Sequence, residues 1–416
     1  MANLFTKIDN LVKPTLYSIF MVHPKIAYIS FDVIPAPKGA GVHIAAFVQA
    51  LATHFGEIQL VTVSPTASAI AEQEIWPNVF QVQLPALGDT VIERSLYFRA
   101  MLGNWWQDRK FAVVHFRSIY EGFPLALYKE KVGDRLIFEV NGLPSIELKY
   151  RYPAIADDRE LLHKLQAQEQ ICLNAADLIV TPSHVTGKYL QTKGVAENKI
   201  RIIPNGVDLE IFTCKDLSIN ITTTTPFKLL YFGTLAAWQG VNLAVEALGL
   251  LCRDLPVELT VIGPIRARQD ENLQALAAKL GVANQLTLLP PLPQAELIAY
   301  IHAADAIVAP LTPNDRNLVQ GCCPLKVLES MATGTPVITS DLPAVRELGE
   351  DERELLLVKP GSAKAIKDAV LKLHANPELK RQIAINARQR IVSSYNWQQA
   401  GKMLASAYGE LGISIN

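Results

Sequence analysis

A lysine and a glutamate in one apolar helical pattern are the residues whose types and spacing point most clearly to chemistry. Lys326 and Glu329 lie three positions apart in the segment from Pro324 to Ser340. Side chains three apart on a helix share one face, so both can reach the same groove. A carboxylate among apolar neighbours needs a partner, because burying an unpaired charge is costly. We therefore expect a polar ligand at this helix, with an ion pair on a solvated surface as the alternative.

A glycine-rich turn is the second candidate for chemistry. It runs from Pro37 to His43 and includes Gly39, Ala40 and Gly41. Glycine lets a ligand approach the backbone closely, and the N–H groups at the start of a helix bind anions. A tight connection between a strand and a helix is the alternative interpretation.

Parallel sheets are the elements expected to position these residues. Short apolar runs alternate with helical patterns, which predicts βαβ units and an α/β fold. We expect strands at 26–30, 57–64, 112–116, 136–140, 178–181, 200–204, 228–232, 258–263, 286–289, 306–309 and 336–340. We expect helices at 42–54, 241–252 and 294–303, and another that carries Glu329.

Two domains follow from the length, because 416 residues are too many for one ordinary core. The polar stretch 213–226, with four consecutive threonines and a final proline, indicates a linker. It separates residues 23–212 from residues 227–396, with a leader at 1–22 and a last helix at 397–416. Open parallel sheets bind ligands beyond the carboxyl ends of their strands, so two doubly wound, Rossmann-like domains are expected to face each other across a cleft.

Composition excludes several classes of protein. The chain has 39 basic and 40 acidic side chains, so no net field favours nucleic acid or anionic lipid. Its five cysteines lack CxxC spacing, which argues against a disulfide scaffold or a zinc site and fits a reducing, cytoplasmic compartment. The apolar run 16–22 is far shorter than the about 20 residues of a membrane span. The leader is therefore expected to be a disordered or surface-packed tail, with peripheral contact at the inner membrane face as the alternative.

The motifs together resemble the family 4 glycosyltransferases, in the order typical of that family, from Lys25 to Tyr408. The resemblance rests on the glycine-rich turn, the string Pro204 to Asp208, the loop Gly233 to Gly240 and the segment with Glu329. It implies the GT-B fold, in which the last helix crosses back to the first domain. It also implies retaining transfer of a sugar from a UDP- or GDP-linked donor to a sugar, lipid-linked or small-molecule acceptor, without metal or cofactor.

The resemblance also implies roles in the donor site. Glu329 takes the ribose hydroxyls, and Lys326 lies at the diphosphate with Thr234 and Gln239. Those last two residues stand where the family usually has an arginine and a lysine. The remaining donor-site residues are expected to be Gly39, Ala40, Gly41, Gly233, Pro324 and Leu325.

A second departure from the family concerns the donor sugar. The family usually has another glutamate eight positions before Glu329, and this chain has Gly321 there. Sugar contact is therefore expected to come from Gln320, Asn317 or the backbone.

In the first domain, Asn141 stands where the family often has a histidine. It can bond a sugar hydroxyl, and a simple turn residue before glycine is the alternative. We name Glu329, Lys326 and Asn141 as candidate catalytic residues. Five charged residues are candidate acceptor contacts. Arg117 and Glu121 lie near the carboxyl end of an expected strand, and structural salt bridges are their alternative role. Glu147, Lys149 and Arg151 lie in a loop expected at 145–153, for which a peripheral, disordered loop is the alternative.

These departures suggest one rival function, and another use of the same fold gives a second. The first is a non-catalytic subunit that binds a nucleotide sugar within a glycosyltransferase complex. The second is an epimerase of the same fold, which predicts clustered carboxylates and histidines in the cleft that the sequence does not indicate. For the transferase, the resemblance implies that the departing phosphate takes the proton of the acceptor on one face of the sugar, so that no protein nucleophile is required.

Overall fold

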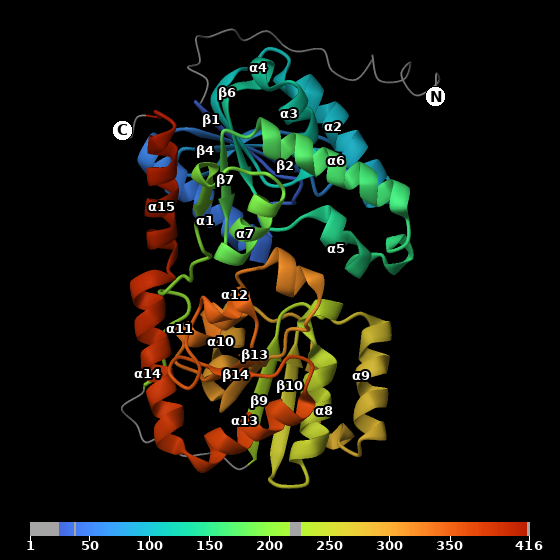
Figure 1. The fold of residues 1–416 in the computed structure, drawn as a ribbon, viewed down its shortest axis with the longest axis vertical. Helices are drawn as coiled ribbons and strands as arrows, with labels where there is room; N and C mark the ends of the chain where they lie inside the picture. Colours follow the sequence, from blue (N-terminus) through green and yellow to red (C-terminus); the bar gives the residue numbers. More distant parts are fainter. Residues whose placement is uncertain (1–24, 37–38, 217–225, 414–416) are drawn as a thin grey trace.

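The computed structural model describes residues 25–36, 39–216 and 226–413. Figure 1 shows two α/β domains, one above the other along the longest axis. The expected leader lies outside the described residues, as do Pro37, Lys38 and most of the expected linker.

The N-terminal domain is built on an eight-stranded sheet with the order β3-β4-β2-β1-β5-β6-β7-β8. Every neighbouring pair is parallel except β3 and β4. The strands are β1 (Ile26–Ile29), β2 (Ile58–Val63), β3 (Ile70–Trp76), β4 (Val79–Leu84), β5 (Phe111–Phe116), β6 (Gly133–Glu139), β7 (Leu178–Thr181) and β8 (Ile200–Ile202). All six strands expected in this half are confirmed. The hairpin of β3 and β4 was missed, and the side chains of β3 are largely exposed, so β3 lacks the apolar run of a central strand.

Helices cover both faces of this sheet (Figure 1). They are α1 (Gly39–Phe55), α2 (Val91–Trp106), α3 (Ile119–Leu127), α4 (Lys129–Val132), α5 (Pro144–Arg151), α6 (Arg159–Ala175) and α7 (His184–Thr192). The loop expected at 145–153 was wrong: this segment forms α5 and a short 3-10 turn. Pro144 is the first residue of α5, where its fixed φ favours a helix and its missing N–H loses no bond.

The C-terminal domain has a six-stranded, fully parallel sheet with the order β11-β10-β9-β12-β13-β14. Its strands are β9 (Phe227–Phe232), β10 (Val257–Ile262), β11 (Leu286–Leu289), β12 (Ala306–Ala309), β13 (Val337–Ser340) and β14 (Leu356–Val358). Its helices are α8 (Val241–Leu251), α9 (Ala267–Lys279), α10 (Gln294–Ala303), α11 (Leu325–Ala332), α12 (Pro343–Arg346), α13 (Ala363–Ala375) and α14 (Pro377–Ser394). The five strands expected in this half are confirmed, and β14 was missed.

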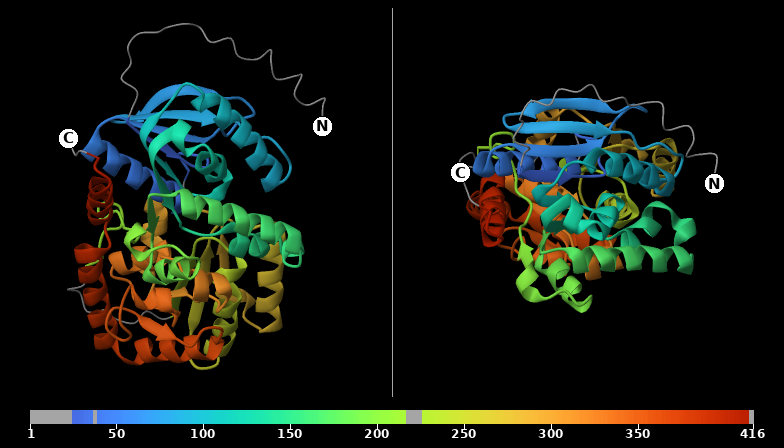
Figure 2. Two further views of the ribbon diagram at one scale, coloured as in Figure 1. Left: turned by 45° about the horizontal axis from the view of Figure 1, so that its top comes forward. Right: turned by 90° about the horizontal axis from the view of Figure 1, so that it is seen from above.

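The last helix, α15 (Trp397–Glu410), returns to the first domain and packs against α1. Both views in Figure 2 place α14 and α15 along one side of the molecule. Close packing explains Gly401, because a Cβ there would lie 2.8 Å from Cβ of Ala50. The expected crossing of the terminal helix is therefore confirmed, and Trp397 packs edge-on against His43 at its start.

None of the described helices is both long enough and apolar enough to cross a membrane.

Candidate functional site

The start of α11 places a buried, unpartnered ammonium between the two domains. Lys326 is only 8 % exposed, and its Nζ has no hydrogen-bond partner among the described residues. Nζ lies 4.0 Å from the centroid of the Tyr231 ring. Burial lowers the pKa of Lys326 to about 7, against the opposite effect of Glu329. A buried ammonium without a counter-charge favours the binding of an anion.

Glu329 lies one turn further along α11 and keeps partial exposure. Burial of its carboxyl raises its pKa to about 7, and the nearby Lys326 acts in the opposite direction. No ion pair between the two side chains is found in the described structure. The alternative of a solvated ion pair is therefore wrong, because Lys326 is buried and unpaired.

The loop after β9 closes over the ammonium of Lys326. Gly233 has a φ of +110°, and a Cβ there would lie 3.4 Å from Nζ and 3.3 Å from Cε of Lys326. In the same loop, Oε1 of Gln239 is buried without a partner, whereas Thr234 is exposed. Buried polar atoms are normally satisfied, so an unpartnered ammonium beside this loop and an unpartnered amide oxygen within the loop favour a polar ligand.

The glycine-rich turn meets α11 from the other domain. A Cβ at Gly39 would lie 3.2 Å from Cδ1 of Leu325, whose neighbour Pro324 precedes the helix. A Cβ at Gly41 would lie 2.2 Å from the carbonyl oxygen of Ala36, so no side chain fits. The structure thus brings the turn of Gly39, Ala40 and Gly41 against the first turn of α11.

Gly321 lies in a position that admits no side chain. Its φ is +82°, and a Cβ would lie 2.9 Å from Oγ of Ser183 and 2.9 Å from Cβ of Val185. Those two residues stand at the start of α7 in the other domain. A glutamate at this position would therefore collide with the N-terminal domain.

The two side chains expected to replace that glutamate are engaged elsewhere. Asn317 is buried, and its Nδ2 donates to the carbonyl oxygens of Trp238 (3.0 Å) and Thr312 (2.8 Å). Gln320 is also buried, and its Oε1 accepts from the backbone N–H of Leu143 at 2.8 Å. Both side chains hold loops in place, so the structure leaves neither free for a sugar.

A hydrogen-bond chain joins the N-terminal domain to the start of α11. Asn205 donates from Nδ2 to the carbonyl oxygen of Cys323 at 2.6 Å. Its Oδ1 lies 2.7 Å from Nδ1 of His43 on α1. Nε2 of His43 lies 2.9 Å from Oε1 of Glu139, as an ionic contact rather than an aligned hydrogen bond. Asn205 is thus a direct contact between the two domains.

Glu139, at the end of β6, is the centre of a buried polar cluster that sequence reasoning missed. The carboxylate is 1 % exposed and accepts from Tyr28 Oη (2.6 Å) and Arg117 Nε (2.8 Å), and His115 Nε2 lies 3.1 Å away. Asn141 Nδ2 also donates to it. Burial would raise the pKa of Glu139, but His43, Arg117 and the His115 hydrogen bond hold it well below its usual range.

The sequence did not indicate this grouping of histidines with a carboxylate. His43, His115 and Glu139 form such a cluster, although all three are buried. The signal was a set of polar residues at the carboxyl ends of strands that otherwise have buried runs, as in His115 of β5 and Glu139 of β6. No group of three or more potential ligands suited to a metal ion occurs in the described part of the chain.

Arg117 and Glu121 do not lie free in the cleft. Arg117 pairs with Glu139 and with Asp32, whose Oδ2 lies 3.1 Å from Nη1 of Arg117. Glu121 is fully buried and caps α3 by accepting from Ser118 and from the backbone N–H of Arg117. The structural alternative fits these two residues better than acceptor contact does.

Two of the three candidate acceptor residues on α5 join the domains instead. Glu147 accepts from Arg316 at 3.0 Å, and Lys149 pairs with Asp315 at 2.5 Å. Tyr150 also donates to Asp315. These contacts tie α5 to a π-helical turn, Arg316–Gln320, that precedes Gly321.

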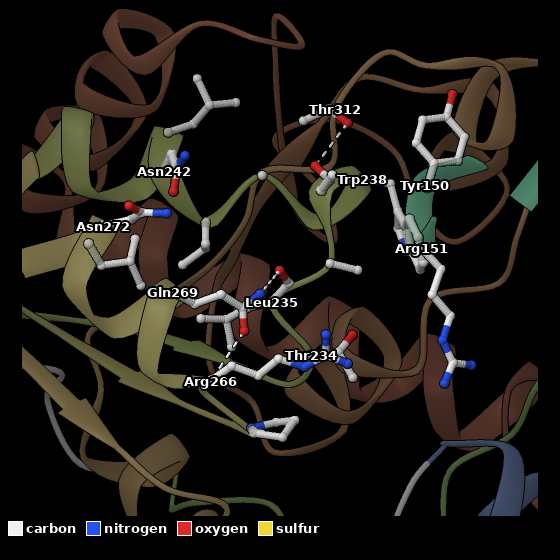
Figure 3. Close-up of a pocket in the computed structure, with 17 residues that line it drawn as sticks. Tyr150, Arg151, Thr234, Leu235, Trp238, Asn242, Arg266, Gln269, Asn272 and Thr312 are labelled. Carbon is white, nitrogen blue, oxygen red and sulfur yellow. Dashed lines mark hydrogen bonds between the residues drawn. The ribbon is translucent and has the colours of Figure 1, made fainter. Parts of the chain in front are cut away.

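Arg151 has a different position, because it lines a cavity between the domains. The cavity has a volume of about 630 Å³ and lies beside the loop after β9. Figure 3 shows Tyr150 and Arg151 on one wall and Arg266 and Asn272 on the opposite one.

Comparisons with known proteins cover both halves of the chain. The family described as "Glycosyltransferase Family 4" matches residues 37–211, and "Glycosyl transferases group 1" matches residues 216–390. A D-inositol 3-phosphate glycosyltransferase of Paenarthrobacter aurescens (strain TC1) is 23% identical over 410 residues, covering 92% of this chain and 98% of that protein. A glycogen synthase of Mycobacterium tuberculosis (strain ATCC 25618 / H37Rv) is 28% identical over 250 residues, covering 60% and 58%.

Solved structures share the fold over nearly the whole chain. Sucrose-phosphate synthase of Thermosynechococcus elongatus superposes with a TM-score of 0.77 at 19% identity, covering 93% of this chain and 98% of that one. Anabaena Alr3699/HepE in complex with UDP-glucose gives a TM-score of 0.70 at 14% identity, covering 92% and 99%. WaaG, a glycosyltransferase involved in lipopolysaccharide biosynthesis, gives 0.66 at 16% identity, covering 92% and 100%.

Proposed function

Because the chain belongs to the glycosyltransferases of the group 1 and family 4 type and has the GT-B fold, we propose that it transfers a sugar from a nucleotide-diphosphate donor with retention of configuration. Glu329 binds the ribose hydroxyls in this proposal, and Lys326 binds the diphosphate. The turn at Gly39 and the loop with Thr234 and Gln239 close the site from two sides.

The single observation that carries the proposal is the unpartnered ammonium of Lys326. A buried charge is stable only when paired, and a diphosphate supplies the missing counter-charge. The position at the start of α11 adds to this, since the N-terminus of a helix favours an anion. One lysine can therefore replace the arginine and lysine that the loop of Thr234 and Gln239 lacks.

The reaction requires few protein groups. The bond between the anomeric carbon and the diphosphate oxygen breaks, the bond to the acceptor oxygen forms on the same face, and the acceptor proton passes to the departing phosphate. Lys326 stabilises the charge that develops on the leaving group. Asn141 binds a sugar hydroxyl through its Oδ1, since its Nδ2 donates to Glu139. Neither a protein nucleophile nor a metal ion takes part in this proposal.

Calorimetry with UDP, GDP and ADP tests donor binding. We expect one diphosphate to bind the wild type, with a loss of at least about tenfold in Glu329→Ala and Lys326→Met. Glu271→Ala, at an exposed position on α9, is the matched control. Unchanged affinity in Glu329→Ala would refute the assigned role.

Transfer is tested with UDP-glucose and GDP-mannose and a panel of acceptors. The anomeric proton of the product, observed by NMR, reports retention or inversion, and addition of EDTA reports dependence on metal. Transfer or donor hydrolysis by the purified chain also excludes the rival of a non-catalytic subunit. An inverted product, or loss of activity with EDTA, would contradict the mechanism.

A further inference from the structure

The charged side chains that line the cavity between the domains are all positive. Seventeen residues line it, and they include Arg151 and Arg266 but no aspartate or glutamate among the described residues. The chain as a whole has a net charge of −1, so this local excess of positive charge is not a reflection of composition. A cavity of about 630 Å³ is within the usual size range of sites for small ligands.

Both arginines keep their guanidinium groups available for a ligand. Neither forms an ion pair in the described part of the chain, and both are exposed. The nearby carboxylates are already used, because Asp315 pairs with Lys149 and Glu147 pairs with Arg316. Guanidinium groups bind phosphate and carboxylate in planar, two-bond geometry, so two of them facing one space favour an anionic ligand.

The rest of the lining suits a molecule with many hydroxyl groups. Asn242 and Asn272 carry exposed amides, which can both donate to and accept from hydroxyls. Tyr150 and Trp238 lie with their ring centroids 5.9 Å apart and give the cavity an aromatic wall. The first turn of α8 also lines the cavity, and no side chain caps this helix.

The cavity lies next to the proposed donor site. Gly233 packs over the ammonium of Lys326, and the following residue, Thr234, lines the cavity. The same loop therefore borders both the cavity and the ammonium to which the donor diphosphate is assigned. Arg151 and Tyr150 come from the N-terminal domain and Arg266 from the C-terminal one, so an occupant also bridges the two domains.

We propose that this cavity holds the acceptor, and that the acceptor is a polyhydroxylated molecule carrying a phosphate or a carboxylate. Arg151 and Arg266 bind the anionic group, and the two asparagines bind hydroxyls. The assignment of the occupant as acceptor rests on the proposed function.

Calorimetry with three probes at low ionic strength tests the proposal: glucose 6-phosphate, glucuronate and neutral glucose. We expect one or both charged probes to bind at least about tenfold more tightly than glucose, and their relative affinity distinguishes a phosphate from a carboxylate site. The double variant Arg151→Gln/Arg266→Gln should lose at least about tenfold, and each single variant should lose part of that. Arg268→Gln is the matched control, because Arg268 is exposed in the first turn of α9, two residues after Arg266, but does not line the cavity.

Three outcomes would overturn the proposal: equal affinity for glucose and the charged probes, unchanged affinity in the double variant, or no binding of any probe at millimolar concentration. UDP binding is measured in parallel, because the double variant should leave it unchanged. If UDP does not bind but the charged probes bind through the two arginines, the proposed function fails while the anionic sugar site stands. Thermal unfolding of each variant excludes loss of folding as the cause.

Discussion

Nζ of Lys326 lies 4.0 Å from the centroid of the Tyr231 ring and has no hydrogen-bond partner among the described residues. The ring stabilises the ammonium only in part, since cation–π contacts are weaker than a full counter-charge. Tyr231 is itself fixed, because its hydroxyl donates to the carbonyl oxygen of Thr234 at 2.6 Å. The ammonium of Lys326 is therefore buried without a counter-charge, and this arrangement leads to two predictions about pH.

Binding of a nucleotide diphosphate should take up a proton above pH 7. Burial lowers the pKa of free Lys326 to about 7, so the amine is mostly neutral at higher pH. A bound diphosphate favours the charged form and raises this pKa again. Calorimetry in two buffers with different ionisation enthalpies measures the uptake. Equal heats in both buffers, or uptake that persists in Lys326→Met, would contradict the assignment.

The pair of Lys326 and Glu329 should give the ligand-free protein a local minimum of stability near pH 7. The pKa of Glu329 is raised from 4.5 to about 7, so its contribution to stability is present below 4.5 and lost as pH rises to 7. The pKa of Lys326 is lowered from 10.5 to about 7, so stability increases as pH rises from 7 towards 10.5.

Urea unfolding across this pH range measures the minimum. The double variant Lys326→Met/Glu329→Gln should flatten the profile, because both titrating groups are removed. A profile that is the same in the wild type and the double variant would show that the pair does not titrate in this window.

The sequence allowed most of the fold and part of the site to be predicted, for local reasons. Strands buried on both faces were predicted correctly, because such burial requires a continuous run of apolar residues. The side chains of β3 are largely exposed, so its sequence has no such run. Lys326 and Glu329 were found because their spacing on one helix is a local property.

Contacts between distant segments could not be found in the same way. Glu139 lies at the end of an apolar strand, and its partners Tyr28 and His115 are 111 and 24 residues away in the chain. The obstruction at Gly321 likewise depends on how α7 packs against the other domain. Such features are set by tertiary packing, which is also why the sequence left open whether Arg117 and Glu121 contact an acceptor or have structural roles.

Gly321→Glu should not restore a donor contact of the usual family kind. The position has a φ of +82° and no room beside Ser183 and Val185, so the change should destabilise the protein by about 1–3 kcal/mol or force the domains apart. Thermal unfolding and the radius of gyration from X-ray scattering measure these effects. Gly103→Ala is the contrasting control: its helical site in α2 is open, so stability should rise by up to about 1 kcal/mol. Improved donor affinity in Gly321→Glu would refute the argument.

Glu139→Gln should be strongly destabilising. The change removes the carboxylate that pairs with Arg117 and contacts His43, and it leaves a buried guanidinium with only the partly exposed Asp32. Breaking a buried ion pair from one side costs about 3–5 kcal/mol. Urea unfolding measures the loss, and Glu271→Gln, at an exposed site, should stay within about 0.5 kcal/mol of the wild type.

Asn205→Asp should weaken donor binding although Asn205 is not among the proposed donor contacts. An aspartate keeps an oxygen for Nδ1 of His43 but cannot donate to the carbonyl oxygen of Cys323, which Asn205 holds at 2.6 Å. The start of α11 would then lose one fixed point, and Lys326 would be positioned less well. We expect the Kd of the nucleotide diphosphate to rise about three- to tenfold.

The structural explanation for this effect can be separated from general instability. Asn198→Asp makes the same chemical change at an exposed position and should leave the Kd unchanged. Asn205→Ala loses both hydrogen bonds, so it should weaken binding at least as much as Asn205→Asp and should also lower the thermal midpoint, because His43 is left unsatisfied. If Asn205→Asp binds the diphosphate as tightly as the wild type does, the contact with Cys323 does not position α11, and the link between the domains serves stability alone.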